Sequence, residues 1–281
     1  MSKAQRLAEL YKDRRLTEGY PGLDELQRQE IQRRGQRASP DCRQTVAYLT
    51  RLLPPGPRQR SALVVGCGPH PEIIRVLTAA GFVAAGVEPV PAIVQEARAF
   101  LGAEQQVLQG AAEALPVADN SQTAVLLESV LEHVDSPERT LAELYRVTQP
   151  GGLVYLTTTN RLAWRNNEYR RRFFQWFPPL LQEAYVHHHL HFDPSLANYT
   201  TRPAVHWFSY ATLCRLGRGA GFYKFYSKLD VVTAADRPIA NSRLRRFLFE
   251  RIRTSPLLRA LALTQEAGGA IFMCKRPAAA E

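Results

Sequence analysis

Two glycines at the end of a short apolar run point to a ligand-binding turn. Residues 61–67 read SALVVGC, and the glycines Gly66 and Gly68 flank Cys67 where this run closes. Glycine lets the backbone approach a ligand closely, and the first strand-to-helix turn of an open α/β sheet lies where ligands bind. A second run, FVAAGVE, ends on Glu88, whose carboxylate could accept hydrogen bonds from ribose hydroxyls. These residues predict a site for a nucleotide-like cofactor.

Position 71 separates two candidate cofactors. The spacing from Gly66 to Glu88 suits a dinucleotide and S-adenosylmethionine equally well. A dinucleotide site asks for a third glycine, in the pattern G-x-G-x-x-G, so that a helix start can pack on the strand and receive a pyrophosphate. Pro71 occupies that third position, which disfavours NAD, whereas a methionine tail carries no pyrophosphate.

Short apolar runs alternate with helical periodicity around these residues. Strands are predicted at 61–67, 82–88, 105–110, 123–129, 153–159, 222–232 and 268–276, and helices at 71–81, 91–102, 136–147 and 209–221. Ser136 and Pro137 are a typical N-cap and first helical residue. Strands that alternate with helices indicate βαβ units, and therefore a doubly wound α/β fold whose sheet is covered on both faces.

Four motifs in this order carry a family resemblance. The segments VVGCGPH, GVEPV, AAEALPVADNS and VLLESVLEHVDSPERTLAELYRVTQPGGLVYLTTTN, within about residues 62–160, resemble class I S-adenosylmethionine-dependent methyltransferases. The resemblance is nearest to the branch that includes small-molecule and quinone O-methyltransferases. It implies a Rossmann-like, seven-stranded, mostly parallel sheet whose last strand is antiparallel.

The resemblance also implies a set of cofactor-binding residues. Gly66 and Gly68 would line the methionine and ribose portion of S-adenosylmethionine, and Glu88, followed by Pro89, would hold the ribose hydroxyls. The residues implied further along the chain are Ala112 and Glu113, bordering the adenine, and Glu128 and Ser129, near the sulfonium.

His133 is the candidate catalytic residue. It comes just after the fourth predicted strand, at the ligand edge of the sheet. An oxygen nucleophile benefits from a general base whose pKa lies near neutrality, and histidine suits that role. The alternative is a histidine that orders the loop before Ser136.

No metal site is expected in this loop. Some quinone O-methyltransferases hold a divalent metal with the pattern Glu-x-x-Glu-His, and Glu132 and His133 match its last two positions. Ser129 stands at the first position and Glu128 is one place off, which turns its side chain away.

Residues 161–205 interrupt the alternation and read as a lid. Their aromatic residues could wall an apolar substrate pocket or pack a small core of the insertion itself. The arginines among them could meet an anionic group or form a solvated face. The histidines of HHHLH at 187–191 could be metal ligands, but a substrate-facing or surface loop is favoured. His191 and His206 are secondary candidates for general base or substrate contact.

Composition restricts the cellular context. The four cysteines lie far apart without a CxxC pair, which favours a reducing compartment. No apolar run approaches a membrane span, and the charged N-terminal stretch lacks a signal-peptide core. We expect a cytoplasmic protein. The net charge of +10 is compatible with nucleic acid, but no asparagine-proline motif of base-modifying enzymes is present.

A basic amphipathic stretch at 242–253 suggests a different anionic partner. Its apolar residues Leu244, Phe247, Leu248 and Ile252 can share one helical face, with five arginines around them. This face would contact an anionic membrane peripherally, or would pack on the lid.

The predicted organisation has four parts. They are an N-terminal helical segment at 1–57, a cofactor-binding core at 58–160, the lid at 161–205, and a C-terminal part of the core at 206–281 with a basic helical insertion at about 233–266. The expected activity is methyl transfer to a small or lipid-linked acceptor, and the expected acceptor atom is an oxygen. The alternatives are a non-catalytic relative that acts as a partner protein and a nucleic-acid methyltransferase.

Overall fold

The computed structural model of the 281-residue chain describes the central and C-terminal parts of the protein. The described residues are 42–54, 60–102, 105–165, 172–178, 180–182, 184–185, 204, 206–233, 235–236, 242–266 and 269–278. The predicted helical pattern of residues 1–41 and the histidines at 187–191 lie outside them.

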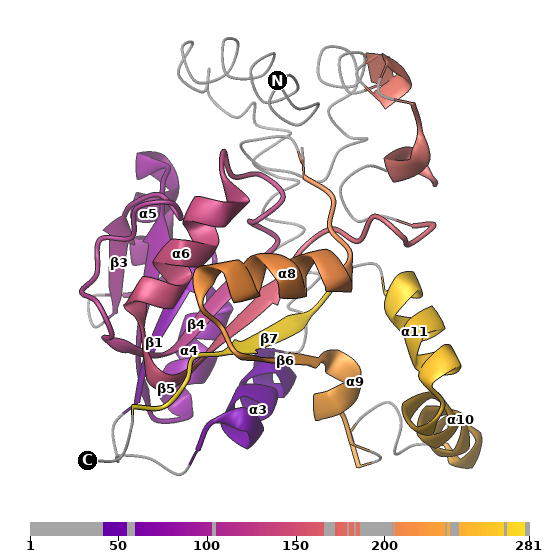
Figure 1. The fold of residues 1–281 in the computed structure, drawn as a ribbon. Coiled ribbons are helices and arrows are strands. Elements are labelled where there is room, and N and C mark those ends of the chain that lie inside the picture. Colours follow the sequence, from indigo (N-terminus) through magenta and orange to yellow (C-terminus); the bar gives the residue numbers. More distant parts are fainter. Residues whose placement is uncertain are drawn as a thin grey trace.

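A seven-stranded sheet forms the centre of the molecule, in the order β3-β2-β1-β4-β5-β7-β6 (Figure 1). Its strands are β1 (Arg60–Val65), β2 (Phe82–Glu88), β3 (Gln106–Gln109), β4 (Gln122–Glu128), β5 (Thr148–Thr157), β6 (Lys224–Ser227) and β7 (Ile271–Cys274). Strands β1 to β5 pair in parallel, while β7 lies antiparallel between β5 and β6. The predicted mostly parallel sheet with an antiparallel last strand is confirmed.

Helices cover both faces of the sheet because its strands are apolar on both sides. Alternate strand residues such as Val64 and Leu126 pack against α3 (Cys42–Leu52) and α4 (Glu72–Ala79). Their neighbours, such as Leu63 and Leu127, pack against α6 (Pro137–Val147) and α8 (Tyr210–Ala220) on the opposite face. Helix α5 (Pro91–Leu101) contributes Val94 and Ala97 to a smaller cluster with Val107 of β3.

The helix-start signals act as predicted. The Ser136 side chain accepts a hydrogen bond from the Arg139 backbone N–H, and Pro137 is the first residue of α6. This satisfies a donor that would otherwise lack a partner at the helix start. Ser209 caps α8 in the same way, and α8 ends at Gly221, which has a φ of +111°.

The strand predicted over 222–232 is wrong in its second half. Strand β6 ends at Ser227, and a single helical turn, α9 (Lys228–Val231), follows. The Asp230 carboxylate accepts hydrogen bonds from both the backbone N–H and the hydroxyl of Ser227, at 2.7 Å each. This local capping contact overrides the β propensity of the aromatic and β-branched residues around it.

Two further helices are described between α9 and β7. The predicted basic helix is α10 (Arg243–Thr254), and α11 (Pro256–Gln265) follows after one residue, inside the helical insertion predicted at about 233–266 but not predicted as a separate helix. Phe249 is the buried residue of α10, whereas Leu244, Phe247 and Leu248 are exposed. These three side chains therefore do not contribute to the core that the described residues form. No helix among the described residues is long and apolar enough to cross a membrane.

Candidate functional site

The turn after β1 folds over the end of β2. The backbone N–H groups of Gly66 and Cys67 both donate to the Val87 carbonyl, at 2.8 and 3.1 Å. Gly66 and Gly68 each have a φ of +67°, a conformation that glycine adopts at little cost. The turn therefore depends on both glycines, and it brings the carboxyl ends of β1 and β2 together.

Glu88 lies at the centre of this junction. Its Oε2 accepts a hydrogen bond from the Gly68 N–H at 3.2 Å, and its Oε1 accepts one from the Val90 N–H at 3.5 Å. The side chain is 6% exposed, and burial raises the pKa of its carboxyl group although both hydrogen bonds oppose the shift. Pro89, the next residue, is exposed. The structure thus brings together Gly68 and Glu88, which lie 20 positions apart in the chain and were both predicted to bind the cofactor.

The two glycines face different surroundings. A Cβ on Gly66 would lie 2.3 Å from Cγ2 of Val130, whereas a Cβ on Gly68 would meet no described heavy atom within 4 Å. Gly66 therefore lets the β1 turn touch the loop after β4, whereas no described residue fills the space beside Gly68. Strand order reverses between β1 and β4, which is where open α/β sheets bind ligands. Val130 was not predicted, because this contact depends on which strands are neighbours.

The start of α4 is poorly suited to a pyrophosphate. A pyrophosphate needs free backbone N–H donors at a helix N-terminus. Pro69 and Pro71 have none, and Glu72 places a carboxylate in the first turn of α4. This arrangement agrees with the interpretation that Pro71 disfavours a dinucleotide.

Residues 129–136, called here the β4 loop, begin beside the end of β5. Glu128 is the last residue of β4, and burial raises the pKa of its carboxyl group. Ser129 has a φ of +54°, and its backbone N–H donates to the Thr157 carbonyl at 3.0 Å. Glu128 and Ser129 thus lie at the carboxyl edge of the sheet, one strand away from Gly66.

Glu132 anchors the middle of the β4 loop. It is 1% exposed, and its Oε2 accepts a hydrogen bond from the Thr158 hydroxyl at 2.7 Å. Burial raises the pKa of its carboxyl group to about 7. The Glu132 carbonyl also accepts from the His206 N–H at 3.2 Å. Glu132 was considered only as a metal ligand in the sequence, yet here it bonds to the segment after β5.

His206 supports the same loop. Its Nε2 lies 2.9 Å from the Val134 carbonyl, and a carbonyl only accepts, so Nε2 carries the proton. Burial lowers the pKa of the imidazole, which favours this neutral form. His206 was predicted as a secondary candidate for general base or substrate contact. In the structure its Nε2 instead donates a hydrogen bond to the backbone of the β4 loop.

Glu113 holds the far end of the β4 loop. Its Oε1 accepts a hydrogen bond from the Asp135 N–H at 2.8 Å. Ala112, beside it, is 6% exposed and packs with Leu115 in the core. The pair predicted to border an adenine therefore lies next to the β4 loop.

His133 lies between these anchor points. It is half-buried, and its backbone N–H donates to the Val130 carbonyl at 2.9 Å. The loop on either side is fixed by Glu132, His206 and Glu113. The backbone that carries His133 is therefore held in place from both sides.

The described aromatic residues of the insertion pack largely on one another. Phe174 is 2% exposed, and its ring centroid lies 5.3 Å from that of Tyr185 and 5.8 Å from that of Trp207. Phe173 and Trp176 stack outside this centre at 5.1 Å and are exposed. Arginine side chains cover one ring, since Arg165 and Arg172 lie 4.3 and 5.1 Å from the centroid of Trp164. The small core of the insertion is thus observed for Phe174 and its neighbours.

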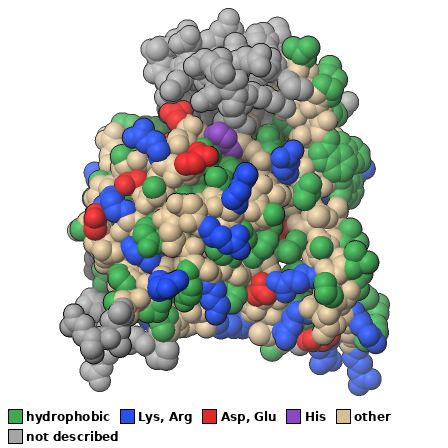
Figure 2. All heavy atoms as spheres, viewed as in Figure 1, with side chains coloured by type: hydrophobic (Ala, Val, Ile, Leu, Met, Phe, Trp, Pro, Cys, Tyr) green, Lys and Arg blue, Asp and Glu red, His purple; other side chains and the backbone are tan. Residues whose placement is uncertain are grey.

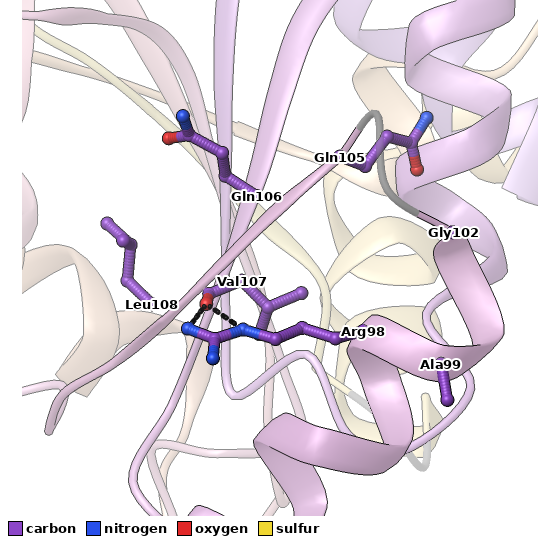
Figure 3. Close-up of a pocket in the computed structure, with 7 residues that line it drawn as sticks. All are labelled: Arg98, Ala99, Gly102, Gln105, Gln106, Val107 and Leu108. Carbon is purple, nitrogen blue, oxygen red and sulfur yellow. Dashed lines mark hydrogen bonds between the residues drawn. The ribbon is translucent and has the colours of Figure 1, made fainter.

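A pocket away from this edge lies between α5 and β3 (Figure 3). Gln105 and Gln106 line it at the start of β3, which is the amino end of a parallel strand. The Arg98 guanidinium donates to the Val107 carbonyl through Nε at 3.0 Å and Nη2 at 2.6 Å. This pocket therefore lies at the opposite edge from Gly68 and Glu88, and its arginine is occupied by the backbone.

No three histidine, cysteine or acidic side chains among the described residues are grouped closely enough to hold a metal ion.

The glycine turn, the acidic end of β2 and the switch between β1 and β4 define an open α/β sheet of the kind that binds ligands at its carboxyl edge. Residues 63–156, which hold all of these features, match the family described as methyltransferase domain. This part of the chain is similar to methyltransferase domains, and its strand order is Rossmann-like.

Named relatives match the same part of the chain. An uncharacterized methyltransferase of Mycobacterium bovis (strain BCG Pasteur) is 39% identical over 104 residues, which cover 37% of this chain and 41% of that protein. One from Mycobacteroides abscessus is 40% identical over 106 residues, covering 36% and 40%. The match thus spans about two fifths of the length of these curated relatives.

A solved structure resembles the fold over more of the chain. The S-adenosylmethionine dependent methyltransferase from Mesorhizobium loti aligns with a TM-score of 0.51 and 14% identity. The alignment covers 81% of this chain and 95% of that one. At this identity the likeness concerns the fold alone.

Proposed function

We propose that the protein transfers a methyl group from S-adenosylmethionine to a small or lipid-linked acceptor, at an oxygen atom. The observation that carries the proposal is the contact between Gly68 and Glu88, made at the strand switch of a methyltransferase domain. The oxygen acceptor follows the resemblance to small-molecule and quinone O-methyltransferases, together with the place of His133 at this edge.

The residues present fit S-adenosylmethionine. No described residue lies within 4 Å of a Cβ placed on Gly68, so the methionine and ribose portion can pass close to the backbone there. Each Glu88 oxygen accepts a single backbone hydrogen bond and retains lone-pair capacity for a ribose hydroxyl. Ala112 and Glu113 would border the adenine, while Glu128 and Ser129 would lie near the sulfonium. Bound in this way, the cofactor supplies a methyl group on a positively charged sulfur.

His133 is the residue we propose as general base. Methyl transfer is an in-line displacement, so the positions of donor and acceptor supply much of the rate. The anchors Glu132, His206 and Glu113 hold the β4 loop, and a fixed loop gives His133 a defined place beside the Glu128 end of β4. There it would take the proton from the acceptor hydroxyl.

Calorimetric titration with S-adenosylmethionine and NAD side by side tests the cofactor. We expect binding of S-adenosylmethionine and none of NAD. Glu88→Ala should weaken binding roughly 10- to 150-fold, the effect of losing hydrogen bonds to a charged group. Glu72→Ala is the matched control, since it removes an exposed carboxylate from the neighbouring helix start. Equal affinity of the wild type and Glu88→Ala would overturn the assignment of Glu88.

The acceptor requires a second measurement. Metabolites and lipids of deletion and wild-type cells should differ by a compound that lacks one methyl group. The purified protein should then methylate that compound with labelled S-adenosylmethionine. Cofactor binding without any such transfer would favour the non-catalytic alternative.

A further inference from the structure

We propose that helices α10 and α11 form a docking surface for an anionic lipid membrane. The surface consists of six exposed apolar side chains and five arginines, called here the hairpin surface. The apolar members are Leu244, Phe247, Leu248, Leu257, Leu258 and Leu261, and the arginines are Arg243, Arg245, Arg246, Arg251 and Arg253.

The apolar side chains of these helices point outward instead of into the core. Leu244 is 65% exposed and Leu257 is 78% exposed. Helix α11 has no buried residue, and α10 has only Phe249, which packs in the cluster under α3. The hydrophobic effect places large aliphatic side chains inside a protein, so a group of exposed ones marks a contact surface.

The charge of α10 identifies the kind of contact. The helix carries five exposed arginines and a single acidic residue, Glu250. Among the described residues these arginines form no ion pair, and Arg251 lies over the Phe247 ring at 5.1 Å. Figure 2 shows blue and green side chains interleaved at the lower right, where Figure 1 places α10 and α11. An anionic membrane matches both the positive charge and the apolar side chains.

Nucleic acid fits this surface less well. Phosphates would pair with the arginines, but the leucines would gain nothing from a polyanion. A lipid surface gives each group a partner, because arginines reach the head groups while leucines enter the acyl boundary. The six apolar side chains therefore favour an anionic membrane over nucleic acid as the partner.

The hairpin surface is joined to the carboxyl edge of the sheet. Asn160 follows β5 there and is 3% exposed. Its Nδ2 donates to the carbonyls of Leu263 at 2.9 Å and Glu266 at 2.8 Å, at the C-terminal end of α11. Arg259 of α11 pairs with Asp230 at 2.6 Å. Helix α11 therefore links the hairpin surface to the carboxyl edge of the sheet, where the candidate site lies.

Co-sedimentation of the whole protein with vesicles tests the proposal. The probes are phosphatidylcholine vesicles with and without one third phosphatidylglycerol, at low and high salt. We expect binding to the anionic vesicles at low salt, and a loss of that binding at high salt. Equal binding to both vesicle types, or no binding, would overturn the proposal.

Paired variants separate the surface from overall charge. Arg243→Glu with Arg251→Glu should weaken binding at least about 30-fold, since each lost basic residue is worth about fivefold in affinity and the new carboxylates add repulsion. Arg43→Glu with Arg215→Glu makes the same charge change on exposed residues of α3 and α8, and should weaken it less than about threefold. Equal effects of the two pairs would show a contact without a defined surface and would overturn the proposal.

The leucines require their own test. Leu257→Gln with Leu261→Gln should weaken binding about tenfold, since two partly inserted side chains no longer enter the lipid. Val83→Gln, at a residue 56% exposed on β2, is the control. Unfolding midpoints should stay unchanged, because none of these side chains is buried. If the leucine pair has no effect while a duplex oligonucleotide binds through the arginines, the partner is nucleic acid and the proposal fails. Conversion of an oligomer to a monomer by the leucine pair, without vesicle binding, would also overturn it.

Discussion

The β1 turn and the β4 loop touch each other, yet they are held by different means. The β1 turn is built from backbone, with two glycines at positive φ and N–H groups bonded to Val87 and Glu88. The β4 loop is fixed by side chains, among them Glu132, Glu113 and His206. A backbone turn leaves room for a ligand, whereas a loop held by side chains keeps a catalytic group in place. The difference suggests binding at the first segment and chemistry at the second.

The largest expected effect separates these two roles. His133→Ala, in the β4 loop, should lower turnover about 10²- to 10⁴-fold, the usual contribution of a general base. The affinity for S-adenosylmethionine should change less than about twofold, because His133 is not among the residues proposed to bind the cofactor. Rates of methyl transfer and calorimetric titration measure the two quantities.

His70→Ala is the control for that variant. His70 is exposed in the β1 turn, and its ring packs edge-on against Phe100 at 5.2 Å. Turnover should be retained. A His133→Ala protein that is less stable but turns over normally would assign His133 to ordering the loop.

The contact between the two segments can be broken at one glycine and spared at the other. Gly66→Ala places a Cβ 2.3 Å from Val130 Cγ2 and strains a φ of +67°. It should lower the free energy of unfolding by about 3 kcal/mol, from overpacking and backbone strain together. Gly68→Ala has the same φ without a described neighbour within 4 Å, and should cost about 1 kcal/mol.

Urea denaturation compares the two glycine variants, and titration adds a second readout. Gly68→Ala should lose more binding free energy for the cofactor than unfolding free energy, since its methyl group would lie where the cofactor is proposed to bind. Equal destabilisation by both variants would contradict the close approach of the two segments.

The β4 loop should also make stability depend on pH. Burial raises the pKa of Glu132 to about 7 from an ordinary value of 4.5. The folded protein therefore keeps this proton at pH values where the unfolded chain has lost it. This favours the folded state fully below pH 4.5, and the stabilisation is lost as the pH rises through about 7.

Glu132→Gln removes this dependence while keeping an acceptor for the Thr158 hydroxyl. At pH 8 the variant should be more stable than the wild type by about 2 kcal/mol, and at pH 5 the two should be close. Unfolding at both pH values checks this. A wild type that gains stability between pH 5 and 8 relative to the variant would contradict the raised pKa.

The smallest effect is expected at the far end of the β4 loop. Glu113→Ala removes the acceptor of the Asp135 N–H at 2.8 Å. It should cost about 1 kcal/mol of unfolding free energy, the worth of one partly exposed hydrogen bond. Glu96→Ala, at an exposed residue of α5, should change stability by less than about 0.5 kcal/mol.

The order of the elements could be predicted because it depends on local patterns. Strand β2 runs over 82–88 as expected, and Ser136 with Pro137 sets the start of α6. The missed helix α11 also has a local signal, since Ser255 caps it and Pro256 begins it. The change from strand to helix after Ser227 instead depends on the hydrogen bond from the Ser227 N–H to the Asp230 carboxylate, which outweighs the β propensity of the neighbouring residues.

The internal support of the site could not be predicted. The contacts of Val130 with Gly66, of Glu132 with Thr158 and of Glu113 with Asp135 join segments that meet only once the strands are ordered. Residue type identifies a glycine or a histidine as a candidate. It does not say which buried carboxyl group will hold its loop, because that depends on tertiary neighbours.

The place of β7 between β5 and β6 has a consequence for how the chain assembles during synthesis. Strand β6 leaves the ribosome before β7, yet within the described sheet β7 is its only neighbour. Until residues 271–274 emerge, β6 has no strand to pair with, while β1 to β5 can already pair. The growing chain should therefore fold in two stages, with the ligand edge formed first and the hairpin surface attached when β7 enters.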